Sequence, residues 1–204
     1  SNGDARGGNV SATMASENFN ISYTAATAKA NNYTAGGDFK TTTATGRNGH
    51  TLALDEVGST AYETRTQTLG FAMKGGNHLV EAKLGYQEVP EQLYPNQRMD
   101  MLDNTQKRFN LRYLGQFDWG TLEARAYRET VDHYMDFGAD KRFWYGNAMP
   151  PLGSGGPMAI NGSPCSPISG TCAAGMPMYT ESKTTGFNLK ADVLLSEKDL
   201  LRVG

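Results

Sequence analysis

Methionine is the residue type in this chain whose spacing most clearly suggests a chemistry. Most of the nine methionines lie between the strongly periodic segments, and some of them form Met-x-Met pairs. Because side chains at positions i and i+2 of an extended segment point the same way, each pair places two thioethers together. Thioethers are soft ligands that suit Cu(I). The candidate metal ligands are Met99, Met101, Met176 and Met178, with His133 and Met135 as additional ligands. The alternative is that these methionines only fill irregular gaps in packing.

A second candidate site is a short basic and aromatic run at Arg142, Phe143, Trp144 and Tyr145. These side chains could bind an anionic or catecholate ligand through cation–π contacts and hydrogen bonds. The alternative is ordinary aromatic packing within a loop or an aromatic girdle.

The two cysteines, Cys165 and Cys172, lie close together in a segment rich in glycine and proline. This spacing favours a local disulfide, which implies an oxidising compartment. Metal binding by the pair is the alternative. We expect the disulfide to restrain a loop that has almost no apolar core of its own.

The remaining reactive residues do not form an enzyme signature. His50, His78 and His133 are scattered without the spacing of a zinc site, and no nucleophile motif surrounds a serine or a cysteine. The glycine pairs lack a phosphate-binding pattern, and a net charge of -2 argues against a nucleic-acid binder. We therefore expect neither an enzyme nor a bound cofactor.

The segments that would position these residues alternate with period two, as β-strands do. Residues 109–117 show the alternation best. One face carries Phe109, Leu111, Tyr113 and Phe117, and the other carries Asn110, Arg112 and Gln116. Residues 187–195 repeat it, with Phe187, Leu189, Ala191 and Val193 on the apolar side and Asn188 and Lys190 on the polar side.

Connections between these segments alternate in length along the whole chain. Tight turns fall near residues 17, 76, 119 and 198, and long loops fall near 45, 96 and 158, the second of them spanning residues 90–102. About eight strands follow this rhythm. It predicts an all-β fold of antiparallel strands from a transmembrane β-barrel, with apolar side chains toward lipid, polar side chains toward the lumen and long extracellular loops. A soluble β-sandwich is the alternative.

Charged residues within the strands are expected to face the lumen. The predicted lumen charges are Arg65, Glu81, Lys83, Arg108, Arg112, Glu123, Arg125, Lys190 and Asp192. Arg128 breaks the alternation of its strand. It either lies above the hydrocarbon band or follows a β-bulge that reverses the faces.

The whole chain resembles the TonB-dependent outer-membrane receptors, particularly those of the copper and siderophore type. The stretches that carry the resemblance are NQRMDM at 96–101, RFNLRY at 108–113, DWGTLEA at 118–124, VDHYMD at 131–136, MPM at 176–178 and ESKTTG at 181–186.

This resemblance implies a bacterial outer-membrane receptor with a barrel of about 22 strands that is closed by an N-terminal plug. Residues 1–204 would supply about eight of those strands, and the plug and the remaining strands would lie outside this chain. Its partners would be outer-membrane lipid, the TonB complex acting through the plug, and a cargo of copper or a ferric siderophore. In the siderophore case, residues 142–145 would contact the ligand. A passive porin and a secreted β-rich adhesin or binding domain are the alternatives.

Overall fold

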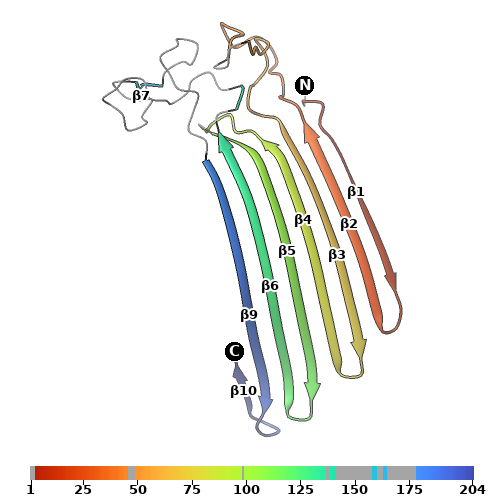
Figure 1. Cartoon of the computed structure of the whole chain (residues 1–204). Coiled ribbons are helices and arrows are strands. Elements are labelled where there is room, and N and C mark those ends of the chain that lie inside the picture. The colour runs from red at the N-terminus through yellow and green to blue at the C-terminus, as the bar shows by residue number, and fades with distance from the viewer. Residues whose placement is uncertain are drawn as a thin grey trace.

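A computed structural model describes residues 3–45, 49–97, 99–136, 138–140, 158–159, 163–164 and 178–204. One antiparallel sheet of eight strands forms most of the described molecule, and its spatial order follows the chain order (Figure 1). Its strands are β1 (Arg6–Ala15), β2 (Phe19–Ala30), β3 (Tyr62–Gly75), β4 (His78–Gln92), β5 (Asp100–Phe117), β6 (Gly120–Asp136), β9 (Met178–Leu194) and β10 (Leu200–Val203). A separate two-stranded ladder joins β7 (Met158–Ala159) to β8 (Ser163–Pro164).

Short and long connections leave the sheet at opposite ends. The tight turns that join β1 to β2, β3 to β4, β5 to β6 and β9 to β10 all lie at the lower end in Figure 1, and the long connections lie at the upper end. We call these the turn end and the loop end. The predicted rhythm of strands is thereby confirmed. No helix among the described residues is long and apolar enough to cross a membrane.

Cross-strand pairing collects the apolar side chains on one face, which we call the apolar face. Directly paired residues point to the same side of an antiparallel sheet, so a row of partners can be followed from strand to strand. One such row consists of Met14, Ile21, Phe71, Ala82, Leu111, Ala126 and Phe187. The row below it, toward the turns, holds Phe19, Met73, Val80, Tyr113, Ala124 and Leu189.

No second layer of described structure covers the apolar face. Phe187 is 66% exposed and Leu84 is 52% exposed, although both lie in the interior of their strands. The buried apolar residues instead lie at the loop end; they are Ala30, Leu52, Ala61, Val89 and Met101. A face this large and apolar is not left in water by a stable soluble domain, so it requires a partner or a lipid environment.

Aromatic side chains gather at the turn end of the apolar face. Phe117 stacks on Trp119 with ring centroids 5.1 Å apart, and His78 stacks on Tyr113 at 5.9 Å. The His78 Nδ1 atom lies 2.8 Å from the Tyr113 hydroxyl. Gly115 leaves room for this cluster, because a Cβ there would lie 2.4 Å from the Tyr113 hydroxyl. Rings with a polar tip are enriched where a barrel passes from hydrocarbon to water.

The opposite face, which we call the polar face, carries most of the charged residues predicted to face the lumen. Arg112 pairs with Glu81 on β4 and with Arg125 on β6, and Asn188 continues the row on β9. The predicted faces of residues 108–113 and 187–193 are confirmed by this register.

Two arginines, Arg65 and Arg128, do not lie on the polar face. Arg65 pairs with Thr27 and Glu88 and shares the face of Leu69, nearer the loop end, so its predicted position among the lumen charges is wrong. Arg128 pairs with Phe109 in a ladder that has no register shift at this point, so the bulge alternative is excluded. Arg128 therefore lies on the apolar face.

The second long loop is shorter than predicted. Strand β4 continues to Gln92 and β5 begins at Asp100, so the predicted loop 90–102 is reduced to residues 93–99. The reason is a pair of register irregularities, one between Glu63 and Arg65 and the other between Met101 and Asp103. A bulge inserts a residue and breaks the period-two pattern, which conceals the end of a strand from sequence reading.

The two faces should respond oppositely to a new charge. In the full-length protein, Leu111→Arg places a guanidinium among apolar side chains and should destabilise the lipid-inserted state by about 2–4 kcal/mol if the site lies near the midplane. Asn110→Arg is the matched control, because it adds the same charge to the polar face one residue away. Urea unfolding in lipid vesicles would measure both. Equal costs for the two substitutions would contradict the assignment of the faces.

Candidate functional site

Three predicted metal ligands lie in one row across neighbouring strands. Met101 on β5 pairs with Met135 on β6, and Met135 pairs with Met178 on β9. Directly opposed residues of an antiparallel pair have Cβ atoms about 4.5–5.5 Å apart, so these three side chains start from neighbouring positions on one face. Met101 is 8% exposed and Met178 is 41% exposed, so the row runs from a buried position to an open one. We call it the methionine row.

His133 lies on the same face as the methionine row, two residues from Met135 on β6. Its cross-strand partners are Asn104 and Thr180. The His133 Nδ1 atom lies 3.0 Å from the Asn104 Oδ1 atom. An amide oxygen only accepts hydrogen bonds, so Nδ1 carries the proton and Nε2 carries the lone pair. A histidine held in this way by a neighbouring acceptor has the tautomer that a metal ligand needs.

The other predicted site residues are not brought together by the described structure. Met99 immediately precedes β5 and therefore does not share a strand with Met101, so the prediction that both point the same way from one extended strand is not supported. Met176, the 142–145 run and both cysteines lie outside the described residues. The disulfide and the aromatic ligand site stay predictions.

Within the described residues, no group of three or more histidine, cysteine, aspartate or glutamate side chains is arranged to hold a metal ion. Methionine thioethers are a further class of ligand, and the methionine row supplies three of them. A hard cation such as Ca²⁺ prefers several oxygen ligands, whereas the methionine row offers thioethers. The chemistry of the row therefore favours a soft cation.

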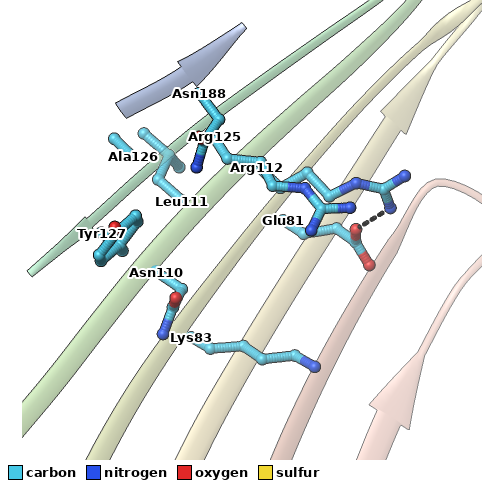
Figure 2. Close-up of a pocket in the computed structure, with 9 residues that line it drawn as sticks. All are labelled: Glu81, Lys83, Asn110, Leu111, Arg112, Arg125, Ala126, Tyr127 and Asn188. Atoms are coloured by element: carbon cyan, nitrogen blue, oxygen red, sulfur yellow. Dashed lines mark hydrogen bonds and ion pairs between the residues drawn. The ribbon is translucent and has the colours of Figure 1, made fainter. Parts of the chain in front are cut away.

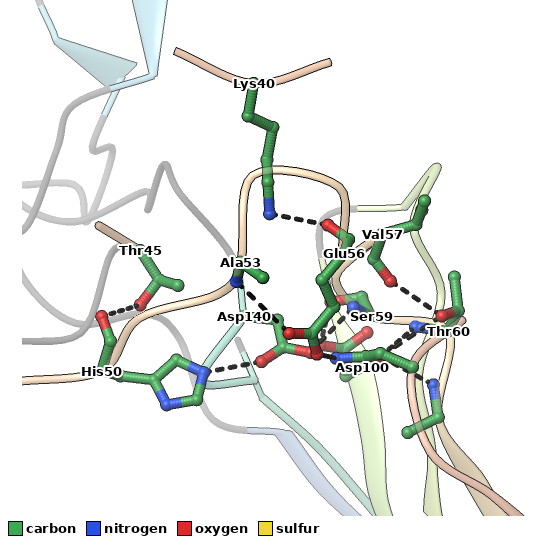
Figure 3. A network of polar contacts seen from close by, with 12 residues as sticks. Lys40, Thr45, His50, Ala53, Glu56, Val57, Ser59, Thr60, Asp100 and Asp140 are labelled. Atoms are coloured by element: carbon green, nitrogen blue, oxygen red, sulfur yellow. Dashed lines mark hydrogen bonds and ion pairs between the residues drawn. The ribbon is translucent and has the colours of Figure 1, made fainter. Parts of the chain in front are cut away.

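A polar network ties the loops together above the row (Figure 3). Asp140, which follows β6, accepts hydrogen bonds from the Asn32 side chain at 2.7 Å and the Ser59 amide at 2.9 Å. Its other oxygen lies 2.8 Å from His50 Nε2. In turn, the side-chain oxygen Oδ1 of Asn32 accepts hydrogen bonds from the backbone amides of Thr60 and Ala61. Side chains distant in the sequence thus anchor the 31–61 loop to the start of the connection after β6.

Asp100 forms the second centre of this network and is completely buried. Its carboxylate accepts hydrogen bonds from the Ser59 hydroxyl at 3.2 Å and from the Tyr94 amide at 2.7 Å. Gly138 packs directly against it, because a Cβ at that position would lie 2.2 Å from Asp100 Oδ2. Ser59 has a φ of 59°, a left-handed conformation that the surrounding hydrogen bonds must hold. Asp100 thereby links three connections at the loop end.

The charge state of Asp140 follows from these contacts. Burial opposes the charged form of the carboxylate, but the hydrogen bonds from Ser59, Asn32 and His50 outweigh burial and hold the pKa of Asp140 below its usual value. Asp140 is therefore an anion at neutral pH. A cavity of about 520 Å³ lies beside it, with Asn32, His50 and Glu91 among the residues in its wall.

On the polar face, a ladder of opposite charges crosses β4, β5 and β6, and Figure 2 shows the contact between Arg112 and Glu81. The Arg112 guanidinium donates to Glu81 at 2.7 Å and to Glu123 at 2.9 Å, and Arg125 also pairs with Glu123. The two arginines are directly opposed across the strands, so the carboxylates offset their repulsion. Glu81, Arg112 and Arg125 line a recess of about 550 Å³ together with Lys83, Asn110 and Tyr127. The recess is open and polar, as expected for a surface that meets water or another polar domain.

Comparison with known proteins identifies the architecture. No family model matches the sequence, and no curated protein matches it. The solved structure of the copper transporter OprC matches 95% of this chain and 25% of its own, with a TM-score of 0.61 and 16% identity. The FrpB iron transporter from Neisseria meningitidis (F3-3 variant) matches 98% of this chain and 28% of its own, with a TM-score of 0.59 and 18% identity.

The sheet has the fold of part of a TonB-dependent receptor barrel. This result confirms the predicted all-β fold. The chain spans about a quarter of the length of the transporters it matches, as the covered shares of 25% and 28% show. At this level of identity the likeness establishes the fold alone.

Sequence reasoning missed the polar network of Asn32, Ser59, Asp100 and Asp140. Asp100 belongs to the 96–101 stretch that carried the family resemblance, but its role depends on Gly138 and Ser59, which are far away in the sequence. The one local signal is a buried acid at the first position of a strand. His50 and Asp140 are 90 residues apart, and no spacing rule predicts their contact.

Removing the Asp140 carboxylate should release the 31–61 loop. Asp140→Ala leaves the Ser59 amide and the Asn32 side chain without their acceptor, and we expect a local cost of about 2–3 kcal/mol. Trypsin cleavage after Lys40 should then accelerate by roughly thirty- to a hundredfold if cleavage tracks the population of the open loop. Asp55→Ala is the matched control, since this side chain lies in the same loop but takes no part in the hydrogen bonds around Asp140 and Asp100. Cleavage at the wild-type rate in Asp140→Ala would contradict this role.

Acidification should loosen the same loop. The pKa of Asp140 is lowered from an ordinary value of 3.8 in the folded protein. Its stabilisation is therefore complete above that value and is lost as the pH falls through the folded-state pKa. Hydrogen exchange at the Ser59 amide, corrected for the intrinsic rate, should lose protection in this acid range. Asp140→Asn should abolish the pH dependence, and the interior of β4 should not share it. Unchanged protection in acid would contradict the prediction.

Proposed function

We propose that this chain forms part of the wall of a bacterial outer-membrane receptor that takes up a metal or a metal–siderophore complex in a TonB-dependent manner. The observation that carries the proposal is the sheet itself. One face is apolar and uncovered, the other is charged, and every long connection leaves at one end. A membrane barrel combines these properties, with lipid against one face and a polar interior against the other.

In this proposal the polar face lines the lumen, where a plug contributed by sequence outside residues 1–204 would pack. The Glu81, Arg112 and Glu123 ladder would then contact the plug or the water around it. Mixed charge suits this role, because a plug that must move needs polar contacts that can exchange with water rather than a fused hydrophobic interface. The loop end is the extracellular side, and the polar network holds its loops over the rim.

The methionine row makes copper the cargo that we favour. It lies on the lumen side at the loop end, where cargo entering from outside would arrive. Thioethers on three adjacent strands, with His133 close by, suit Cu(I). A ferric siderophore is recognised mainly through its organic shell. One of the structural neighbours is named a copper transporter and the other an iron transporter, so the fold is compatible with either cargo.

A passive porin is the second candidate function, because an open polar lumen would also give a charged face. The two functions differ in their energy requirement. Copper or siderophore uptake that stops when the proton motive force is collapsed supports the receptor. Uptake that continues unchanged supports the porin.

The methionine row should determine copper affinity. Met101→Leu/Met135→Leu/Met178→Leu keeps the side chains apolar and of similar size but removes the sulfurs, and it should weaken Cu(I) binding to the full-length protein by at least about tenfold. Met14→Leu/Met73→Leu is the control, because both residues lie on the apolar face and are 59% and 52% exposed. Competition with a chromogenic Cu(I) chelator would measure the affinities.

If the triple variant binds and takes up copper as the wild type does, the copper reading is eliminated. The siderophore reading then remains, and residues 142–145 become the side chains to substitute next. Folding of both variants is checked by the resistance of the barrel to sodium dodecyl sulfate before heating.

A further inference from the structure

Arg128 is the one charged residue within the apolar rows of the central strands. Its partner on β5 is Phe109 and its partner on β9 is Thr185. The next row toward the turns, which includes Leu111 and Phe187, is entirely apolar. One row is two residues along a strand, or about 7 Å. Arg128 therefore stands at the boundary where the apolar rows end.

Lys107 lies one row further toward the loops on the same face, opposite Thr130. Together with Arg128 it borders an open groove of about 540 Å³ on this face. Leu84 and Phe109 form the apolar half of the groove, and they are 52% and 39% exposed. Leu84 and Phe109 lie in the same row as Arg128, and Lys107 lies one row nearer the loops, so the groove combines two cations with exposed apolar side chains.

Neighbouring charges on this face are already neutralised, whereas these two cations are not. Lys183 pairs with Glu181, and Arg65 pairs with Glu63 and Glu88. Asp132 accepts a hydrogen bond from the Tyr179 hydroxyl at 3.0 Å. Among the described residues, no ion pair is formed by Lys107 or Arg128. The carboxylates of this face lie beyond the groove toward the loops, so the groove itself is positive.

We propose that this groove binds a phosphorylated, multiply acylated lipid of the outer leaflet, of the lipid A type. Acyl chains would lie against Leu84 and Phe109, and a phosphate would contact Arg128 and Lys107. Guanidinium groups bind phosphate through paired hydrogen bonds. The exposed apolar side chains beside Arg128, and the apolar row next to it toward the turns, fit an acyl chain rather than a free anion. The inference rests on the outer-membrane setting of the proposed function, and it adds a lipid-binding site to the outside of the wall.

The test is a titration of the full-length protein in detergent micelles with bisphosphoryl lipid A, followed by native mass spectrometry. Lys107→Gln/Arg128→Gln should bind this lipid at least about tenfold more weakly than the wild type. Lys74→Gln/Lys190→Gln removes the same number of charges from the polar face and should bind normally. Lys107→Arg/Arg128→Lys keeps both charges and should retain most of the affinity, which separates loss of charge from loss of folding.

Two further probes define the ligand. Lipid A from which the phosphates have been removed should bind the wild type as weakly as it binds the double glutamine variant. Inorganic phosphate alone should not compete at millimolar concentration. Equal binding of bisphosphoryl lipid A by the wild type and the glutamine variant would overturn the proposal, and so would tight binding of the dephosphorylated lipid or of free phosphate.

The lipid site and the proposed receptor function can fail independently. A protein that transports cargo normally but shows no phosphate-dependent lipid binding contradicts only the lipid site. A protein that binds lipid A through Lys107 and Arg128 but transports nothing contradicts only the receptor function.

Discussion

The continuous antiparallel ladder is the constraint on which the rest of this structure depends. Backbone amides and carbonyls that leave water must be paired, and in a membrane only a helix or a closed barrel of strands satisfies all of them. Once the eight strands of the sheet are hydrogen-bonded in register, the face of each side chain follows from its position in the ladder. The same pairing that aligns Leu111 with Ala126 and Phe187 also aligns Met101 with Met135 and Met178. The apolar rows and the methionine row are thus set by one register.

The two ends of the sheet are stabilised in different ways. At the turn end, short turns and stacked rings such as Phe117 and Trp119 complete the sheet with local contacts. At the loop end, the buried apolar residues are few, and polar side chains hold the loops instead. Asp100 and Asp140 can remain buried or partly buried because backbone amides and side-chain donors surround their oxygens. A polar anchor of this kind can open at lower cost than a hydrophobic core.

Period-two alternation was sufficient to predict the strands, the positions of the tight turns and the faces of residues such as Arg112 and Phe187. It failed where the ladder is irregular. The bulges near residues 64 and 102 displaced the predicted end of a strand. Arg65 is a different case, because it lies in the regular part of β3 and alternates in phase with Leu69, so its predicted face went against the pattern itself. Arg128 is the opposite case. It breaks the alternation of β6, but the ladder has no register shift there, so Arg128 lies on the apolar face. The alternation of side chains describes one strand at a time. A bulge depends on hydrogen bonds to the neighbouring strand, so the alternation within one strand does not predict it.

The sequence by itself determined what is local: alternation of apolar and polar side chains, turn residues, the order of short and long connections, and the presence of soft ligands. These properties arise within a few residues, so they can be read from one strand at a time. Only the tertiary structure decided which residues meet. It joined Met101, Met135 and Met178 into one row, and it brought His50 to Asp140 across 90 residues. Such contacts depend on the register between strands and on how loops fold back over the rim, and both are set by hydrogen bonds between segments distant in the chain.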